Sequence, residues 1–299
     1  MSRGEVLTET YGALMELPWH TGVKASLGAA IDNGRLPHAV LLSGYPGWGE
    51  AELCAWLAAV LLGVDAARDP RTLAHPDCRW IAPEGASIKV DQIRSLAEFV
   101  PGTPQIAAAK VAVIENAHCM NVNAQNALLK TLEEPPGPMF LILGTHRAGS
   151  LSPTVLSRCQ QFAIPRDRAA AAHWLREPAA RALLDDYGGA PLDAMRGSRA
   201  GERPLVELLA DLAAGQPVID ELLGLDAARL SARWARRLVR MLGGGPETPS
   251  GAVMNPRRAF AFAGELTRFH DQVTRSSAAN VRLLLERLCH HWRLLVRPH

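Results

Sequence analysis

Long hydrophobic runs and paired cysteines are both missing from this 299-residue chain. No stretch of about 18 uncharged apolar residues occurs, and Glu5 and Glu9 interrupt the start, where a signal peptide would be basic and then apolar. We therefore expect neither a membrane span nor a secretory signal. The five cysteines are scattered and form no CxxC pair, so we expect no disulfide framework, no zinc ribbon and a reducing cytoplasm.

A large excess of charge of one sign is missing as well. The formal net charge is +2, which excludes a protein that coats nucleic acid over its whole surface. The charge is uneven, because positions 1–203 hold 19 basic and 21 acidic residues whereas positions 204–299 hold 13 and 9. Solvated helix faces and ion pairs are favoured for the later arginines, and a DNA-binding stripe is the alternative.

The first half of the chain alternates strand-like and helix-like segments, which favours an α/β domain with a parallel sheet. Helices are expected over 50–63 and 123–132, and a third is expected to begin with Asp91 as its N-cap. Short apolar segments bounded by turn residues are typical of buried strands. Four such segments occur, at 39–43, 110–114, 140–144 and 160–164.

After Pro165 only helical periodicity is found. Helices are expected over 169–184 and 192–195, and the all-helical remainder is interrupted by a glycine- and proline-rich loop at 243–251. We predict an α/β domain, a small helical domain and an all-α C-terminal domain. Their predicted ranges are 1–165, 166–203 and 204–299.

The segment 44–51, GYPGWGEA, follows a predicted strand and begins a predicted helix, as a phosphate-binding loop of pattern GxxxxGK[ST] does. Glu50 stands at the position of the lysine, and Ala51 stands at the position of the magnesium-binding hydroxyl. Unit charges ~4 Å apart near a protein surface interact by about 4 kcal/mol, so Glu50 should repel a triphosphate. For this loop alone, a chance glycine-rich turn is the alternative. The glycines of the loop are Gly44, Gly47 and Gly49.

A second acidic motif follows the predicted strand at 110–114. In an active ATPase of this architecture, an Asp there holds magnesium and the next residue, a Glu, orients the attacking water. Glu115 and Asn116 stand at these two places. An amide is no general base, so both motifs indicate a nucleotide-binding fold without the chemistry.

Three stretches together resemble the clamp-loader branch of the AAA+ family. They are 36–44 (LPHAVLLSG), 126–136 (NALLKTLEEPP) and 157–159 (SRC). The last two in this order are specific, and the resemblance covers most of 17–165. It implies a P-loop-type parallel sheet with flanking helices, then a helical lid domain, then an all-α collar domain that oligomerises.

A degenerate phosphate loop with an intact SRC motif resembles the delta-prime type of subunit in the clamp loader of bacterial DNA polymerase III. The resemblance implies a non-hydrolysing stator in a heteropentameric ring with ATPase motor subunits and a delta wrench subunit. The sliding clamp and primer-template DNA would be bound through the complex. It also implies that the SRC motif supplies the ring's arginine finger.

Within the SRC motif, Arg158 would enter the ATP site of the neighbouring motor subunit, since a guanidinium there stabilises charge on the γ-phosphate. A surface or lid ion pair is the alternative for Arg158. We expect Ser157 to position its neighbours by hydrogen bonds and Cys159 to be packed.

Two features limit what else this chain would do. Members of the clamp-loader family often carry a four-cysteine zinc module after the loop helix, whereas positions 62–75 contain no cysteine, so we expect neither a metal nor a cofactor. His118 and Cys119 are expected to be structural. Two other functions stay open, namely a competent ATPase motor, which nucleotide binding would reveal, and a free-standing DNA-binding AAA+ relative, which salt-sensitive DNA affinity would reveal.

Overall fold

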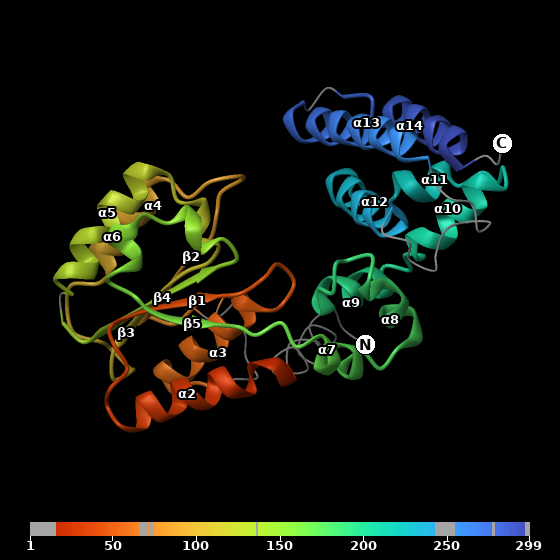
Figure 1. Cartoon of the computed structure of the whole chain (residues 1–299). Coiled ribbons are helices and arrows are strands. Elements are labelled where there is room, and N and C mark those ends of the chain that lie inside the picture. Colours follow the sequence, from red (N-terminus) through yellow and green to blue (C-terminus); the bar gives the residue numbers. More distant parts are fainter. Residues whose placement is uncertain are drawn as a thin grey trace. The chain divides into compact units, whose positions relative to one another are not determined.

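The computed structural model of the chain describes residues 16–65, 71, 74–135, 137–242, 255–276 and 279–296. Glu5, Glu9, Pro136 and the predicted loop at 243–251 lie outside the described residues. The chain divides into two compact units, Met1–Trp174 and Leu175–His299 (Figure 1). The division of the chain into three domains stays a prediction.

The first unit is built around a five-stranded sheet in the order β2-β3-β4-β1-β5, in which all neighbouring strands are parallel. The apolar segments predicted as strands form β1, β3, β4 and β5, because strands with both faces covered need apolar residues throughout. The edge strand β2 was not predicted. The bounds are β1 (Ala39–Ser43), β2 (Cys78–Ile81), β3 (Lys110–Ile114), β4 (Met139–Thr145) and β5 (Gln160–Ala163).

Helices cover both faces of this sheet. Figure 1 shows α2 and α3 on one side and α4 and α5 on the other. Successive strand residues point to opposite faces, so Ala39 and Leu41 of β1 belong to the core shared with α4 and α5. The helices are η1 (Pro18–His20), α2 (Thr21–Asp32), α3 (Glu50–Leu62), α4 (Val90–Phe99), η2 (Ala117–Cys119), α5 (Val122–Glu133), η3 (Ala148–Ser150), α6 (Pro153–Leu156) and α7 (Arg168–Trp174).

The prediction that Asp91 is the N-cap of a helix is wrong by two positions. The N-cap of α4 is Lys89, whose backbone N–H donates to Oε1 of Gln92 at 2.9 Å. Asp91 lies in the first turn, where a carboxylate stabilises the positive end of the helix dipole, and it pairs with Arg94 at 3.2 Å. The Gln92 side chain therefore supplies the cap that was assigned to Asp91.

The single helix predicted over 169–184 is also wrong, because Pro178 begins a new helix at its first position, where proline is tolerated. The second unit is entirely helical in its described part, as predicted. Its helices are α8 (Pro178–Leu184), α9 (Pro191–Arg199), α10 (Leu205–Ala213), α11 (Ile219–Leu223), α12 (Ala227–Leu242), α13 (Pro256–Arg275) and α14 (Val281–Val296).

Aromatic rings form the centre of the second unit. Trp234 of α12 lies 5.7 Å from both Phe262 of α13 and Trp292 of α14, measured between ring centroids, and the latter two rings are 5.4 Å apart. All three side chains are buried. Their apolar area stabilises the packing of these three helices against one another.

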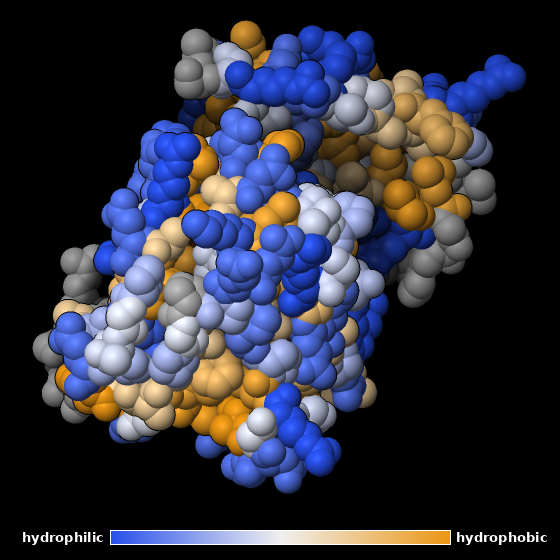
Figure 2. Space-filling model, turned by 90° about the vertical axis from the view of Figure 1, so that its left-hand side faces the viewer, coloured by the Kyte–Doolittle hydropathy of each residue, from blue (hydrophilic) through white to orange (hydrophobic). Residues whose placement is uncertain are grey.

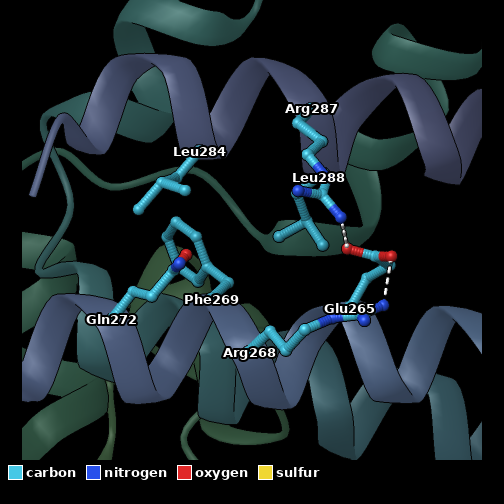
Figure 3. A pocket seen from close by; sticks show the side chains of 7 residues that line it. All are labelled: Glu265, Arg268, Phe269, Gln272, Leu284, Arg287 and Leu288. Atoms are coloured by element: carbon cyan, nitrogen blue, oxygen red, sulfur yellow. Dashed lines mark hydrogen bonds and ion pairs between the residues drawn. The ribbon is translucent and has the colours of Figure 1, made fainter.

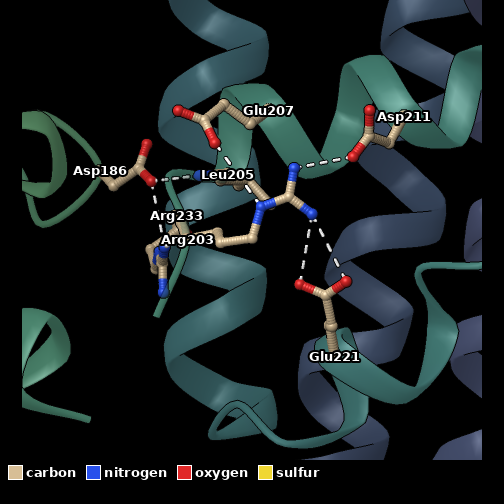
Figure 4. A network of polar contacts seen from close by, with 7 residues as sticks. All are labelled: Asp186, Arg203, Leu205, Glu207, Asp211, Glu221 and Arg233. Carbon is tan, nitrogen blue, oxygen red and sulfur yellow. Dashed lines mark hydrogen bonds and ion pairs between the residues drawn. The ribbon is translucent and has the colours of Figure 1, made fainter. Parts of the chain in front are cut away.

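Arginines of the second unit pair within the chain (Figure 4). Arg233, almost fully buried on α12, binds Asp186 at 3.0 Å and Glu202 at 2.6 Å. Arg203 lies closer to solvent and binds Asp211 at 2.7 Å. The preference for ion pairs over a DNA-binding stripe is confirmed for these two arginines, with partners in the same chain.

The exterior is mixed. Hydrophilic side chains predominate on the face drawn in Figure 2, and hydrophobic ones are interspersed among them. Within the described ranges, every helix is too short or too polar to cross a bilayer.

Candidate functional site

The degenerate phosphate loop joins β1 to α3. Gly47 and Gly49 have φ angles of 74° and 87°, a conformation that residues with a Cβ rarely adopt. Space is also lacking at Gly49, because an added Cβ would lie 2.7 Å from Cδ1 of Leu17 and 3.0 Å from Cε1 of His20. The glycine is thus required by the turn and by the residues of this chain that pack against it.

Aromatic side chains hold the loop from its N-terminal neighbour η1. Trp48 is 1% exposed, and its carbonyl accepts hydrogen bonds of 2.9 Å from Nε1 of Trp19 and from the imidazole Nε2 of His20. Burial lowers the pKa of His20 to about 4, so the ring is neutral at neutral pH and donates its Nε2 proton. The Trp19 ring also meets those of Trp48 and Trp174 edge-on, each at 5.4 Å.

Glu50 faces inward from the first turn of α3 toward the carboxyl end of β4. The residue is 9% exposed, and its Oε1 lies 3.8 Å from Nδ1 of His146. The His146 ring meets His118 with centroids 3.9 Å apart, and Thr145 Oγ1 lies 3.2 Å from Nδ1 of His118. We call these four residues, Glu50, His118, Thr145 and His146, the Glu50 cluster.

The imidazoles of the Glu50 cluster differ from free histidine. Burial, followed by the neighbouring charges of His146 and Arg147, lowers the pKa of His118 to about 4. His118 is therefore neutral at neutral pH and occupies a structural position, as predicted. Ala51, the next residue of α3, carries no hydroxyl that could ligate magnesium.

The second acidic motif converges on the same end of the sheet. Glu115 follows β3, and its Oε2 accepts a 2.9 Å hydrogen bond from Nε1 of Trp80 on β2. Asn116 has a left-handed backbone, with φ of 53°, and turns the chain into η2. Both Glu50 and Glu115 act with burial to raise the pKa of the Cys54 thiol, which places the two motifs beside one buried residue.

The SRC motif lies at the end of α6. Arg158 is the N–H donor to the carbonyl of Thr154 at 3.1 Å, and its Nη2 pairs with Oε1 of Glu133 at 2.6 Å. Its side chain is 34% exposed. Ser157 Oγ donates to the same Thr154 carbonyl at 3.1 Å. Burial raises the pKa of Cys159 to about 11, so this thiol stays protonated, and it belongs to the core of the sheet.

A pocket lies apart from all of these residues, in the second unit between α13 and α14 (Figure 3). Its acidic member, Glu265, is paired with Arg287 at 2.9 Å and with Arg268. In the described ranges, no three His, Cys, Asp or Glu side chains are arranged to hold a metal ion. The pocket is lined by Glu265, Arg268, Phe269, Gln272, Leu284, Arg287 and Leu288.

Several residues of the site were not singled out from the sequence. Trp19 and His20 belong to no motif, and their contact with Trp48 spans 28 to 29 positions. His146 offered one weak signal, because it directly follows a predicted strand at the edge where parallel strands place functional residues. Glu133 lay within a stretch that was used only for resemblance.

Comparisons with known proteins agree on one family. The family model described as DNA polymerase III, delta subunit, matches residues 19–168. A DNA polymerase III subunit delta' of Pseudomonas aeruginosa is 41% identical over 204 residues, which is 60% of each chain. The corresponding subunit of Haemophilus influenzae is 31% identical over 54% of each chain. The match therefore spans less than two thirds of either relative.

One solved structure bears on the fold. A DNA polymerase III, gamma subunit-related protein from Thermotoga maritima has a TM-score of 0.60 and 17% identity, covering 91% of this chain and 99% of its own. This likeness supports the AAA+ fold alone: a parallel sheet with flanking helices followed by a helical region. Because the family model covers half of the sequence and contains both the degenerate loop and the SRC motif, this chain belongs to the DNA polymerase III delta subunit family.

Proposed function

We propose that this chain is a non-hydrolysing stator in the clamp loader of DNA polymerase III, in the cytoplasm. In this role it binds no nucleotide of its own and supplies Arg158 to the ATP site of a neighbouring subunit. The observation that carries the proposal is Glu50, a buried carboxylate at the position where an ATPase needs its phosphate-binding lysine. The degenerate loop sits at the carboxyl end of β1, where this fold otherwise binds phosphates.

Three features argue against nucleotide chemistry at this loop. Glu50 would repel a triphosphate by several kcal/mol relative to lysine, at about 4 kcal/mol per close pair of charges. Ala51 offers no magnesium ligand, and Asn116 replaces the base that would orient water. Each change removes a different requirement, so reversing one of them would leave the others.

Arg158 has the opposite setting. Its guanidinium lies at the surface, 34% exposed, on the short helix α6 that is packed against α5. A planar, permanently charged fork of donors suits recognition of a γ-phosphate. In the proposed ring, the partners are ATPase motor subunits and a delta wrench subunit. The sliding clamp and primer-template DNA are bound by the whole complex.

The test is the ATPase rate of the reconstituted clamp loader, with clamp and primed DNA, for wild type, Arg158→Ala and Arg158→Lys. A trans arginine in GTPase systems contributes about 10³–10⁵ in rate, so at least a tenfold loss is expected for Arg158→Ala. Lys keeps the charge but not the fork and should restore only part of the rate. Gel filtration of each ring establishes that assembly is intact.

An unchanged rate in an assembled Arg158→Ala ring would overturn the proposed role of the arginine. ATP turnover by this chain alone would overturn the non-hydrolysing part and favour a motor subunit instead. Salt-sensitive DNA affinity of the chain alone would favour a free-standing DNA-binding relative.

A further inference from the structure

We infer that Glu133 is a positioning residue that holds Arg158 in a resting orientation, from which the arginine must detach to act on a neighbour. This inference rests on the proposed function. It assigns to the acidic end of α5 a role in the timing of the finger, separate from the role of the finger itself.

The contacts of Arg158 define the resting orientation. Nη2 meets Oε1 of Glu133 at 2.6 Å. Nη1 donates to the Thr154 carbonyl at 3.1 Å and lies 3.4 Å from Ser157 Oγ. Both terminal nitrogens therefore have acceptors in their own chain, on two different sides, and these fix the plane of the guanidinium. A finger in this orientation cannot present both nitrogens to a phosphate.

The position of Glu133 is not explained by helix stability. It is the last residue of α5, where the exposed carbonyl groups make the local field negative and a carboxylate unfavourable. Its side chain is 49% exposed, so it does not serve the core either. A residue that breaks a local rule without local gain points to another role, and the partner that the structure provides for it is Arg158.

The pair is suited to exchange. Both side chains reach solvent, and exposed ion pairs contribute little to stability. A triphosphate carries more negative charge than one carboxylate and accepts two parallel hydrogen bonds from a guanidinium. Closure of the interface around ATP would therefore draw Arg158 away from Glu133, whereas an open interface would leave the two paired.

The experiment uses the complete ring with Glu133→Gln, which removes the charge and keeps the shape. ATPase rates are measured without and with clamp plus primed DNA. We expect the unstimulated rate to rise about two- to fivefold, the range that the loss of an exposed pair allows. The stimulated rate, at which the arginine is already engaged, should change less, so the stimulation ratio falls. Glu133→Asp keeps the charge and should preserve the wild-type ratio.

Glu134→Gln is the matched control, because Glu134 is the adjacent exposed carboxylate and has no recorded partner among the described residues. It should leave both rates unchanged. High salt should shrink the difference between wild type and Glu133→Gln, since salt screens exposed pairs. In an Arg158→Ala ring, Glu133→Gln should have no effect, because its only proposed route of action is gone.

Three results would overturn the inference: an equal change of both rates by Glu133→Gln, the same change in the Arg158→Ala background, or an equal effect of Glu134→Gln. The two proposals fail separately. If Arg158→Ala lowers the rate while Glu133→Gln leaves the stimulation ratio unchanged, only the role of Glu133 is lost. If Arg158→Ala changes nothing in an assembled ring, the proposed function itself is lost.

Discussion

Two ends of the same domain treat charge in opposite ways. At the degenerate loop, the acidic side chains face inward: Glu50 is 9% exposed beside His146, and Glu115 is bonded to Trp80. At the SRC motif, the basic side chain of Arg158 reaches the surface and is held by one exposed carboxylate, that of Glu133. The loop is closed by contacts within the chain, and the motif is open to exchange.

This difference suggests how a nucleotide-binding fold is kept after its chemistry is lost. The loop geometry persists because Trp48 and Gly49 have become part of the core, packed against Trp19, His20 and Leu17. The arginine persists for the opposite reason, since nothing in the core depends on it. The predictions below test the closed end in order of decreasing effect.

The largest effect is expected from Trp48→Ala. Removing a fully buried tryptophan leaves a cavity and typically costs about 3–5 kcal/mol of unfolding free energy. The matched control is Tyr45→Ala in the same loop, whose ring is 54% exposed under Arg166 and should cost about 1 kcal/mol or less. Hydrogen exchange of the β1 amides measures both. Equal costs would show that the loop is not held as a core element.

Acid should weaken the first unit through His20. Its folded pKa of about 4 lies below the ordinary value of 6.5, so between these values the unfolded chain binds a proton that the folded chain does not. Stability is therefore lost as the pH falls from 6.5 to 4, by about 2 kcal/mol at most points near the lower end. His118 adds to the loss in the same window.

His20→Gln isolates this term, because an amide can still donate to the Trp48 carbonyl but does not titrate. Urea unfolding at about pH 7 and pH 4.5 should show a smaller acid loss for the variant than for wild type. Parallel losses in both proteins would mean that His20 is not the group that titrates, and that carboxylates shared by both account for the acid sensitivity.

A smaller difference is expected between two glycine variants. Gly49→Ala and Gly63→Ala both place a Cβ on a backbone with positive φ, 87° and 66° respectively. Only at Gly49 does that Cβ meet other atoms, with Leu17 at 2.7 Å. Gly49→Ala should thus cost about 1–3 kcal/mol more than Gly63→Ala, the usual range for overpacking. Similar midpoints in urea would show that the segment before α2 gives way freely.

No gain at all is expected from partial repair of the loop. Glu50→Lys with Ala51→Thr restores the sequence pattern, but Asn116 still lacks a base and Glu115 is still bonded to Trp80. ATP hydrolysis by this variant alone should stay at background. The same variant carrying Asn116→Glu as well is the comparison. Hydrolysis after the two loop changes alone would contradict the conclusion that the second motif is also inactive.

The sequence predicted much of the fold, and the reasons differ among elements. β1 and β3 begin and end where predicted, because their apolar runs are continuous and bounded by polar or turn residues. β2 was missed because an edge strand needs fewer apolar residues, and Arg79 within it is exposed. The helix predicted across Pro178 was broken by that proline.

The candidate site was predicted in its motifs and missed in its contacts. Glu50, Glu115 and Arg158 were identified by their places in motifs of fixed spacing. Their partners His146, Trp80 and Glu133 come from other elements, and no local pattern announces such pairs. Pairing over long sequence separations is decided by tertiary packing, which single-sequence reasoning does not reach.

The most direct test of the closed loop is equilibrium binding of Mg·ATP to this chain alone, measured by titration calorimetry beside an ATPase motor subunit as positive control. The account predicts no saturable binding up to about 1 mM ATP, which corresponds to a binding free energy weaker than about −4 kcal/mol. Saturable binding with a micromolar Kd would contradict it, because a buried carboxylate at position 50 would then not exclude a triphosphate.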